Sequence, residues 1–358
     1  MTGAPRVSWA RRLALAAGGL LLGLGVGEIL FRLVPFERVK YEVRYGHYSG
    51  NEVGRFLEYD PILTFRNRRS TSIPQTGVRI NAFGLRGPDV SATKRAGVIR
   101  VLCLGDSCTF GSLHPYPEML QAILDERAPG RFEVLNGGVI GYTSVHGLEW
   151  FERELGRLSP DVVTLYYGWN DMWRQKDSAV RALFKSRVAG EPQPHFRSYL
   201  WEALSRGLVF ARNWLGRSPL QAPPPLQVPP EQYRVVLEHF AALGRERRFA
   251  TVFLTAPAGF DDDQTPPWLV RKGFVARGDS APRLRQEYNQ VVVEVAERER
   301  LPLVDLASDF TSGGGRAFFE KPDEDPIHPN QRGYRRIAEA LATELLKMFA
   351  PIAAAASP

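Results

Sequence analysis

From residue 98 onward, short apolar runs alternate with amphipathic stretches, and this alternation is the feature that most constrains the fold. The apolar runs cover residues 98–104, 132–135, 161–167, 250–255 and 301–306. Turn residues and a stretch with helical spacing follow each run, which is typical of strands joined by crossover helices in a parallel sheet. Before the last such stretch, Asn330 stands where a helix N-cap is expected. The sequence therefore predicts an α/β fold, a three-layer αβα sandwich with a five-stranded parallel sheet.

Composition narrows the class of protein. Of the 358 residues, 44% are hydrophobic and 24% are charged, which excludes wholesale disorder and a protein with many membrane spans. Two cysteines are too few for a disulfide-dense scaffold or for a four-cysteine zinc module. The net charge is +7, but the basic residues are scattered rather than concentrated in a stripe. Nucleic acid is therefore not predicted as a partner.

An apolar segment, residues 13–34, follows a basic N-terminal tail of residues 1–12. As a helix, its 22 residues would span the ~30 Å of a bilayer's hydrocarbon layer. Its two charged residues, Glu28 and Arg32, lie one helical turn apart and can pair near the interface. The segment predicts one transmembrane anchor. A cleavable signal peptide is the alternative, but no clear A-x-A cleavage site follows, which favours the anchor.

Two properties of this anchor are less constrained. Basic residues flank both of its ends, so the positive-inside rule does not decide its orientation. Gly19, Gly23 and Gly27 form a doubled G-x-x-x-G pattern, which can mark a face for helix pairing. A weak dimer through the transmembrane helix is therefore a further expectation.

After the anchor, the pattern divides the chain into a polar, turn-rich lead-in, an α/β domain and a tail, with boundaries at 35–97, 98–349 and 350–358. The tail is predicted to be disordered. Two insertions, 173–230 and 259–282, interrupt the sandwich pattern; the first holds a predicted short helix, 199–214, and is interpreted as a lid or excursion over the end of the sheet. The second carries three consecutive aspartates, 261–263. A metal site is conceivable there, but a charge run in a loop is usually a solvated surface, so neither a metal nor a cofactor is predicted.

Polar motifs follow the predicted strands, where open parallel sheets gather their reactive groups. They are Gly-Asp-Ser-Cys at 105–108, Asn-Gly-Gly-Val-Ile-Gly at 136–141, Gly-Trp-Asn-Asp at 168–171, and Asp-Pro-Ile-His-Pro at 325–329 before the last helix. A serine on a strand-to-helix turn exposes its hydroxyl where backbone amides favour an anion. A glycine turn leaves a backbone N–H uncovered, and an asparagine offers an amide donor. The Asp-x-x-His spacing places a carboxylate within reach of the imidazole.

These four motifs, in this order, resemble those of the SGNH hydrolases, also called the GDSL family, and the resemblance covers roughly residues 98–348. It implies a flavodoxin-like sandwich and a Ser-His-Asp triad. In that triad Ser107 resembles the nucleophile, His328 the general base, and Asp325 the residue that orients His328. A serine hydroxyl is a poor nucleophile unless a neighbouring base accepts its proton, so the three roles depend on one another.

The resemblance also implies an oxyanion hole, with Gly138, Asn170 and the backbone N–H of Ser107 as its donors. The sequence departs from the family where Cys108 replaces the usual leucine, and we expect this cysteine to pack rather than react. Cys103 lies on the first buried strand and is interpreted as a small core residue.

The implied function is that of a membrane-tethered serine esterase with an extracytoplasmic catalytic domain. Its expected substrates are carboxylic esters, with a short acyl group on a carbohydrate or a lipid, by family analogy. An O-acyltransferase acting on a polysaccharide with the same triad is one alternative, because the Asn-x-x-Gly-x-Arg stretch at 81–86 is similar to the lead-in of anchored polysaccharide-modifying relatives. A non-catalytic carbohydrate-binding domain is the other.

Overall fold

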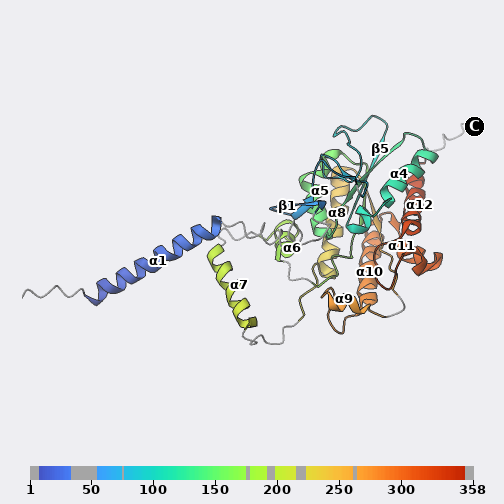
Figure 1. Cartoon of the computed structure of the whole chain (residues 1–358). Coiled ribbons are helices and arrows are strands. Elements are labelled where there is room, and N and C mark those ends of the chain that lie inside the picture. Colours follow the sequence, from blue (N-terminus) through green and yellow to red (C-terminus); the bar gives the residue numbers. More distant parts are fainter. Residues whose placement is uncertain are drawn as a thin grey trace, which may run out of the picture. The chain divides into compact units, whose positions relative to one another are not determined.

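Five parallel strands form the central sheet of the protein's computed structural model (Figure 1). They are β5 (Ile99–Gly105), β6 (Phe132–Gly138), β7 (Val162–Tyr166), β8 (Ala250–Leu254) and β9 (Leu303–Val304). Their order in the sheet is β6-β5-β7-β8-β9, so the chain starts in the second position and reverses direction once. This confirms the predicted sheet, with strand ends that differ from the prediction by a few residues. The structure describes residues 8–33, 55–74, 76–174, 178–191, 198–214, 223–260 and 264–350.

Helices cover both faces of the sheet, which confirms the three-layer sandwich (Figure 1). On one face α4 packs against α12, and on the other face α8 packs against both α5 and α10. The bounds are α3 (Ser107–Phe110), α4 (Tyr116–Arg127), α5 (Ser144–Arg153), α6 (Ser178–Leu183), α8 (Pro230–Arg247), α9 (Pro267–Arg271), α10 (Ala281–Glu299), α11 (Leu306–Gly313) and α12 (Gln331–Met348). Asn330 caps α12 as predicted, since its side chain accepts the Gly333 N–H at 3.0 Å.

The core lies on both sides of the central strands. In β5 the run from Val101 to Leu104 is fully buried, and β7 is buried along its whole length. Strands of a parallel sheet covered on both faces read as continuous apolar runs, and this explains why the sequence pattern located them.

The lead-in segment forms two antiparallel hairpins rather than an extended polar stretch. The strands β1 (Leu57–Asp60) and β2 (Thr64–Asn67) form one hairpin, and β3 (Thr71–Ile73) and β4 (Val78–Ile80) form the other. Several apolar side chains of the lead-in are buried, namely Leu57, Leu63, Phe65, Ile73, Val78, Ile80 and Leu85. The segment then bridges to the central sheet, where Arg86 pairs antiparallel with Asn136 of β6. The lead-in is therefore part of the compact unit that holds the sheet, residues 42–191 and 223–358.

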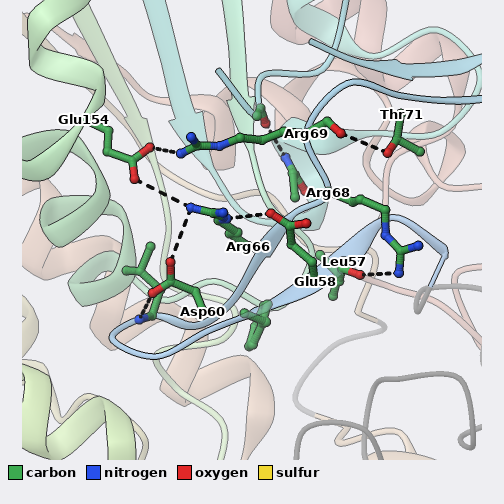
Figure 2. A network of polar contacts seen from close by, with 12 residues as sticks. Leu57, Glu58, Asp60, Arg66, Arg68, Arg69, Thr71 and Glu154 are labelled. Atoms are coloured by element: carbon green, nitrogen blue, oxygen red, sulfur yellow. Dashed lines mark hydrogen bonds and ion pairs between the residues drawn. The ribbon is translucent and has the colours of Figure 1, made fainter. Parts of the chain in front are cut away.

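A network of ion pairs fastens the first hairpin to the end of α5, as Figure 2 shows. The Arg66 guanidinium lies 2.7 Å from a carboxylate oxygen of Glu58, 3.5 Å from one of Asp60 and 3.8 Å from one of Glu154. Arg69 also pairs with Glu154, which ends α5. The end of α5 thus contacts the last part of β2 and the residues that follow it.

A second compact unit consists of residues 1–41 and 192–222. It contains α1 (Trp9–Leu33) and α7 (Tyr199–Trp214), and the second of these confirms the helix predicted for 199–214. Among the described residues, α1 is the one helix long and apolar enough to cross a membrane. The helix α7 groups with α1 and not with the unit that holds the sheet. The predicted tail beyond residue 350 and the aspartates 261–263 lie outside the described residues.

Candidate active site

Ser107 is the first residue of α3, directly after β5, so its hydroxyl stands at the carboxyl edge of the sheet. The carboxylate of Asp106 caps this short helix and accepts the Cys108 N–H at 2.8 Å. The end of β6 passes so close to this turn that a Cβ on Gly138 would lie 2.1 Å from the Phe110 nitrogen. The turn therefore requires glycine at this point of β6.

The structure brings Ser107, His328 and Asp325 together, although the serine lies 221 positions from the histidine. Nε2 of His328 is 2.8 Å from Oγ of Ser107, and Nδ1 is 2.8 Å from Oδ2 of Asp325. The other carboxylate oxygen of Asp325 accepts the N–H groups of Ile327 and His328, each at 3.1 Å. We assign the proton to Nδ1, because the carboxylate can only accept. This leaves Nε2 free to accept a proton from the serine hydroxyl.

The surroundings of His328 and Asp325 favour the charged forms of both side chains. Burial by itself would lower the pKa of His328, but the hydrogen bond and negative charge of Asp325, with the charge of Asp106, outweigh it and raise that pKa above 6.5. Burial likewise opposes ionisation of Asp325, and its hydrogen bonds with His328 and Ile327 still hold its pKa below the ordinary value. The site thus stabilises an imidazolium beside an ionised carboxylate.

Asn170 also lies at this edge and lines the same pocket as Ser107. Its Nδ2 donates to the backbone oxygen of Tyr142 at 3.0 Å and to Oδ2 of Asp106 at 3.3 Å. Burial raises the pKa of Asp106 to about 6. These contacts fix the direction of the amide, and a substrate oxygen would have to share one of its two hydrogens.

The loop that carries Asn170 is fixed by a buried carboxylate. Asp171 accepts the N–H of Ser144 at 3.0 Å, the hydroxyl of Ser144 at 2.6 Å and the N–H of Gly168 at 3.1 Å. Burial raises the pKa of Asp171 to about 7, against the effect of these hydrogen bonds. Asp171 therefore joins the loop after β7 to the start of α5.

Gly138, which ends β6, and Gly141, which follows it, differ in what their N–H groups contact. The N–H of Gly138 donates to Oδ1 of Asn136 at 2.9 Å, and Gly138 is not among the residues that line the pocket. This hydrogen bond argues against the oxyanion-hole role predicted for Gly138, because its donor is already used. Gly141 is half-exposed, has a φ of +84°, and its N–H contacts no acceptor within the described part of the chain. The sequence pattern placed both glycines in the turn but did not indicate which of their N–H groups is engaged internally.

A pocket of about 240 Å³ opens beside the serine and the histidine. Its lining includes four aromatic side chains that we call the aromatic wall, Trp169, Trp173, Trp268 and Phe274. The rings of Trp169 and Trp173 stack with centroids 5.8 Å apart, and Phe274 packs 5.2 Å from Trp173. The insertion 259–282 supplies Trp268 and Phe274. Sequence reasoning missed these two, because nothing in their local pattern shows that the insertion folds back onto the site.

Sequence reasoning also missed Arg86. Its buried guanidinium donates to the backbone oxygens of Phe110 at 2.8 Å and Gly111 at 2.6 Å, and also to that of Ser112. These are the residues that end and follow the short helix of Ser107. The Asn-x-x-Gly-x-Arg stretch at 81–86 was the sequence feature that contains this residue. It indicated a family resemblance but no structural role for the arginine.

Both cysteines are free and fully buried. Burial raises the pKa of Cys103 to about 12 and also raises that of Cys108, whose sulfur lies 3.6 Å from the Ile327 backbone oxygen. These thiols pack, as the sequence predicts, and neither lines the pocket. Within the described ranges no group of histidine, cysteine and acidic side chains is arranged to hold a metal ion.

Comparison with known proteins gives a family match and distant structural neighbours. The sequence matches the GDSL-like lipase/acylhydrolase family over residues 103–336. Among solved structures it is similar to a lipase/acylhydrolase from Enterococcus faecalis, with 19% identity over 70% of this chain and 97% of that one and a TM-score of 0.46. An acetylxylan esterase from Geobacillus stearothermophilus shows 18% identity over 70% and 96% of the two chains, with a TM-score of 0.45. A search of curated proteins finds no match.

Proposed function

Because the chain belongs to the GDSL-like lipase/acylhydrolase family, we propose that it is a membrane-tethered serine esterase that hydrolyses carboxylic esters with short acyl groups. Membership supports an acylhydrolase at the level of the family. The catalytic residues, the tether and the substrate are our own assignments, and each has its own support and test.

The observation that carries the proposal is the hydrogen-bonded chain from Asp325 through His328 to Ser107, with 2.8 Å at both steps. In the proposed reaction, Oγ of Ser107 attacks the ester carbonyl while Nε2 of His328 takes the hydroxyl proton. The tetrahedral intermediate collapses, the C–O bond to the alcohol breaks, and His328 returns the proton to the leaving oxygen. A water molecule then repeats the sequence on the acyl-serine and releases the acid. Asp325 keeps Nδ1 protonated throughout.

The negative oxygen of the intermediate needs donors, and three groups are proposed for this. The N–H of Ser107 contacts no acceptor within the described residues, and neither does that of Gly141. Asn170 lies in the pocket wall and would share with the substrate one of the amide hydrogens that it donates to Tyr142 and Asp106. Gly141 thus replaces Gly138 in the proposed oxyanion hole. Loss of one such donor typically costs ~10² to 10³ in turnover.

The pocket supports a small acyl group. Its volume of about 240 Å³ has to hold the acyl chain and the first atoms of the alcohol, and the aromatic wall offers flat apolar surface beside the reacting serine. We propose an acetyl or similarly short ester of a carbohydrate or lipid as the substrate class.

Active-site labelling tests the nucleophile. A fluorophosphonate probe should label the wild type on Ser107, and Ser107→Ala should abolish both labelling and hydrolysis of p-nitrophenyl acetate, with a loss of ~10⁴-fold or more. Ser112→Ala is the matched control, since Ser112 is exposed and close in sequence, and it should retain both. Labelling that persists in Ser107→Ala would exclude Ser107 as the nucleophile.

The same assay separates hydrolysis from transfer. With an oligosaccharide acceptor present, we expect acetate to be released and the acceptor to remain unmodified. Acetylated oligosaccharide without appreciable release of acetate would replace the esterase by an acyltransferase.

The tether rests on α1, whose composition and length suit a membrane span. Carbonate washing of membranes should leave the full-length protein in the pellet. Recovery in the supernatant at reduced mass would mean that the segment is a cleaved signal sequence instead.

A further inference from the structure

A polar joint links α1 and α7 within the unit formed by residues 1–41 and 192–222. The carboxylate of Glu28, near the end of α1, accepts the hydroxyl of Ser198 at 2.9 Å and the N–H groups of Tyr199 and Leu200 at 3.1 and 3.0 Å. Glu28 therefore satisfies the first amide donors of α7, which would otherwise lack intrahelical partners. An acidic residue in an apolar helix is costly in lipid unless it is paired, and this joint gives Glu28 its partners.

Packing around the joint brings the two backbones close. Arg32 pairs with Glu28 at 2.9 Å and lies over the ring of Tyr199, 5.4 Å from its centroid. A Cβ on Gly27 would meet the methyl groups of Leu200 at 3.4 Å, so α7 begins against a small residue of α1. The start of α7 is thus fixed at the last turns of α1.

From the joint onward, α7 presents an apolar stripe to its surroundings. Trp201, Leu204 and Leu208 recur at intervals of three and four residues and therefore share one face of the helix. Their exposed fractions are 69%, 50% and 63%. By helical spacing, positions 202 and 206 lie away from this stripe. Large apolar side chains in one exposed stripe mark a contact surface.

We propose that α7 is an interfacial membrane helix, which lies at the boundary of the bilayer with its Trp201, Leu204 and Leu208 stripe in contact with lipid. This inference rests on the proposed membrane tether. Glu28 lies five residues before the end of α1 at Leu33, which is ~7 Å along a helix axis and places the joint near the headgroups when α1 spans the bilayer. An amphipathic helix that starts there can bury its apolar face ~5–10 Å into the interface.

Lipid is favoured over a protein partner because the stripe continues an apolar surface. All described residues of α1 are exposed or half-exposed, and α1 itself is almost wholly apolar. The stripe begins one residue after Leu200, which contacts α1. A bilayer that covers α1 therefore reaches the first residue of the stripe without any further partner.

The consequence concerns how the catalytic unit is held. The chain passes between the two units three times, near residues 41, 191 and 222. An interfacial α7 would anchor the last two passages as well as the first. The proposed esterase would then act on esters at the bilayer surface, such as acylated lipids or membrane-bound glycans.

Site-specific labelling of the full-length protein in lipid nanodiscs tests the orientation of α7. Because Cys103 and Cys108 are fully buried, a cysteine introduced on the surface can be labelled selectively with an environment-sensitive fluorophore. The test position is Leu208→Cys, and Glu202→Cys on the opposite face is its matched control. Leu20→Cys in α1 reports independently on the tether. Each is measured with and without lipids that carry a shallow doxyl quencher.

We expect the label at position 208 to be quenched severalfold more than the label at 202, and the label at position 20 to be shielded from aqueous iodide. Equal, weak quenching at 208 and 202, with position 20 shielded, would overturn the inference and leave the tether intact. Equal, strong quenching at both would mean that α7 is immersed, which also overturns it. If iodide quenches position 20 freely, the tether fails, and the inference fails with it.

Hydrogen exchange tests the joint itself. Glu28→Ala removes the acceptor of the first α7 amides, and the amides of Tyr199 and Leu200 should exchange about ten-fold faster, as expected for the loss of a helix cap. The first-turn amides of α12, which Asn330 caps, serve as the internal reference and should not change. Unchanged exchange at Tyr199 and Leu200 would show that Glu28 does not hold α7.

Discussion

At the residue scale, the imidazole of His328 is placed between an acceptor and a donor that come from distant parts of the chain. Asp325 belongs to the same short loop, and the backbone N–H groups of that loop hold its other oxygen. Ser107 arrives from the end of the first central strand. The distance between His328 and Ser107 therefore depends on how the fold places the loop of Asp325 and His328 beside the turn that carries the serine.

The raised pKa of His328 predicts the pH dependence of ester hydrolysis. The histidine acts as a base only when it is neutral, so kcat/KM should fall as the pH drops, with a midpoint above 6.5. In Asp325→Asn the carboxylate that raises this pKa is absent, so the midpoint should move to lower pH and kcat should fall ~10² to 10⁴-fold. A pH profile of p-nitrophenyl acetate hydrolysis measures both. Asp323→Asn, which changes an exposed carboxylate in the same loop, should leave the profile unchanged; an unshifted midpoint in Asp325→Asn would contradict the assignment.

The sequence predicts the residues of this site where a motif fixes them locally, and fails where tertiary packing decides. Ser107, His328 and Asp325 were singled out by their motifs and by the family resemblance of those motifs, and the structure brings them into contact. Gly138 was chosen over Gly141 because a glycine turn shows an available donor but not which N–H is used internally. The aromatic wall was missed in part because Trp268 reaches the pocket from an insertion whose path the sequence does not reveal.

At the scale of elements, the short helix that carries Ser107 depends on a side chain outside the sandwich. The Arg86 guanidinium donates to the backbone oxygens of residues 110, 111 and 112. Its own backbone N–H donates to the backbone oxygen of Asn136 in β6. A single residue of the lead-in thus connects the serine turn to the neighbouring strand. The lead-in thus supports the serine turn, although none of its described residues lines the pocket.

Loss of the Arg86 guanidinium should therefore reduce both stability and turnover. Arg86→Ala leaves buried carbonyls without donors, and the free energy of unfolding should fall by ~2–4 kcal/mol. Turnover should fall with little change in KM, because the serine turn loosens while the pocket remains. Urea unfolding and steady-state kinetics measure the two effects. The matched control is Arg79→Ala, whose exposed pair with Asp89 should be worth ~0–1 kcal/mol; equal losses in both variants would refute the role of Arg86.

The elements of the sandwich were more predictable than those of the lead-in. A central parallel strand such as β5 is buried on both faces, so it reads as one apolar run. The lead-in strands have only three or four residues each and are flanked by arginines. Their buried residues, such as Leu57 and Phe65, alternate with charges that pair across the hairpin and with α5 (Figure 2). The polar composition of the lead-in therefore gave no indication that its apolar side chains are buried.

At the scale of the whole molecule, the boundary of the folded unit follows from these contacts. Residues 42–191 and 223–358 form one compact unit, and the lead-in is inside it. The sequence boundary at residue 98 falls inside that unit and separates the hairpins from the sheet to which Arg86 links them. Only the position of the apolar N-terminal segment was clear from composition alone.

Truncation tests this boundary. A chain that starts at residue 42 should be folded and should hydrolyse p-nitrophenyl acetate, since it retains the whole unit that contains Ser107 and His328. A chain that starts at residue 98 lacks the buried apolar side chains seen in the described part of the lead-in and should aggregate. Size-exclusion chromatography and thermal unfolding compare the two. A monomeric, cooperatively melting chain from residue 98 would show that the lead-in is dispensable for folding.

The outermost position of β6 in the sheet carries one more consequence. An edge strand offers unpaired backbone groups to any similar chain, and this is a common route to intermolecular β-pairing. Here those groups are occupied from within: Gln121 of α4 accepts the N–H of Val134 and donates to the oxygen of Phe132, and Arg86 donates to that of Asn136. At the opposite border, β9 has only two residues, so it offers few backbone groups to a strand of another molecule. Both borders of the sheet are thereby less open to pairing with a strand of another molecule.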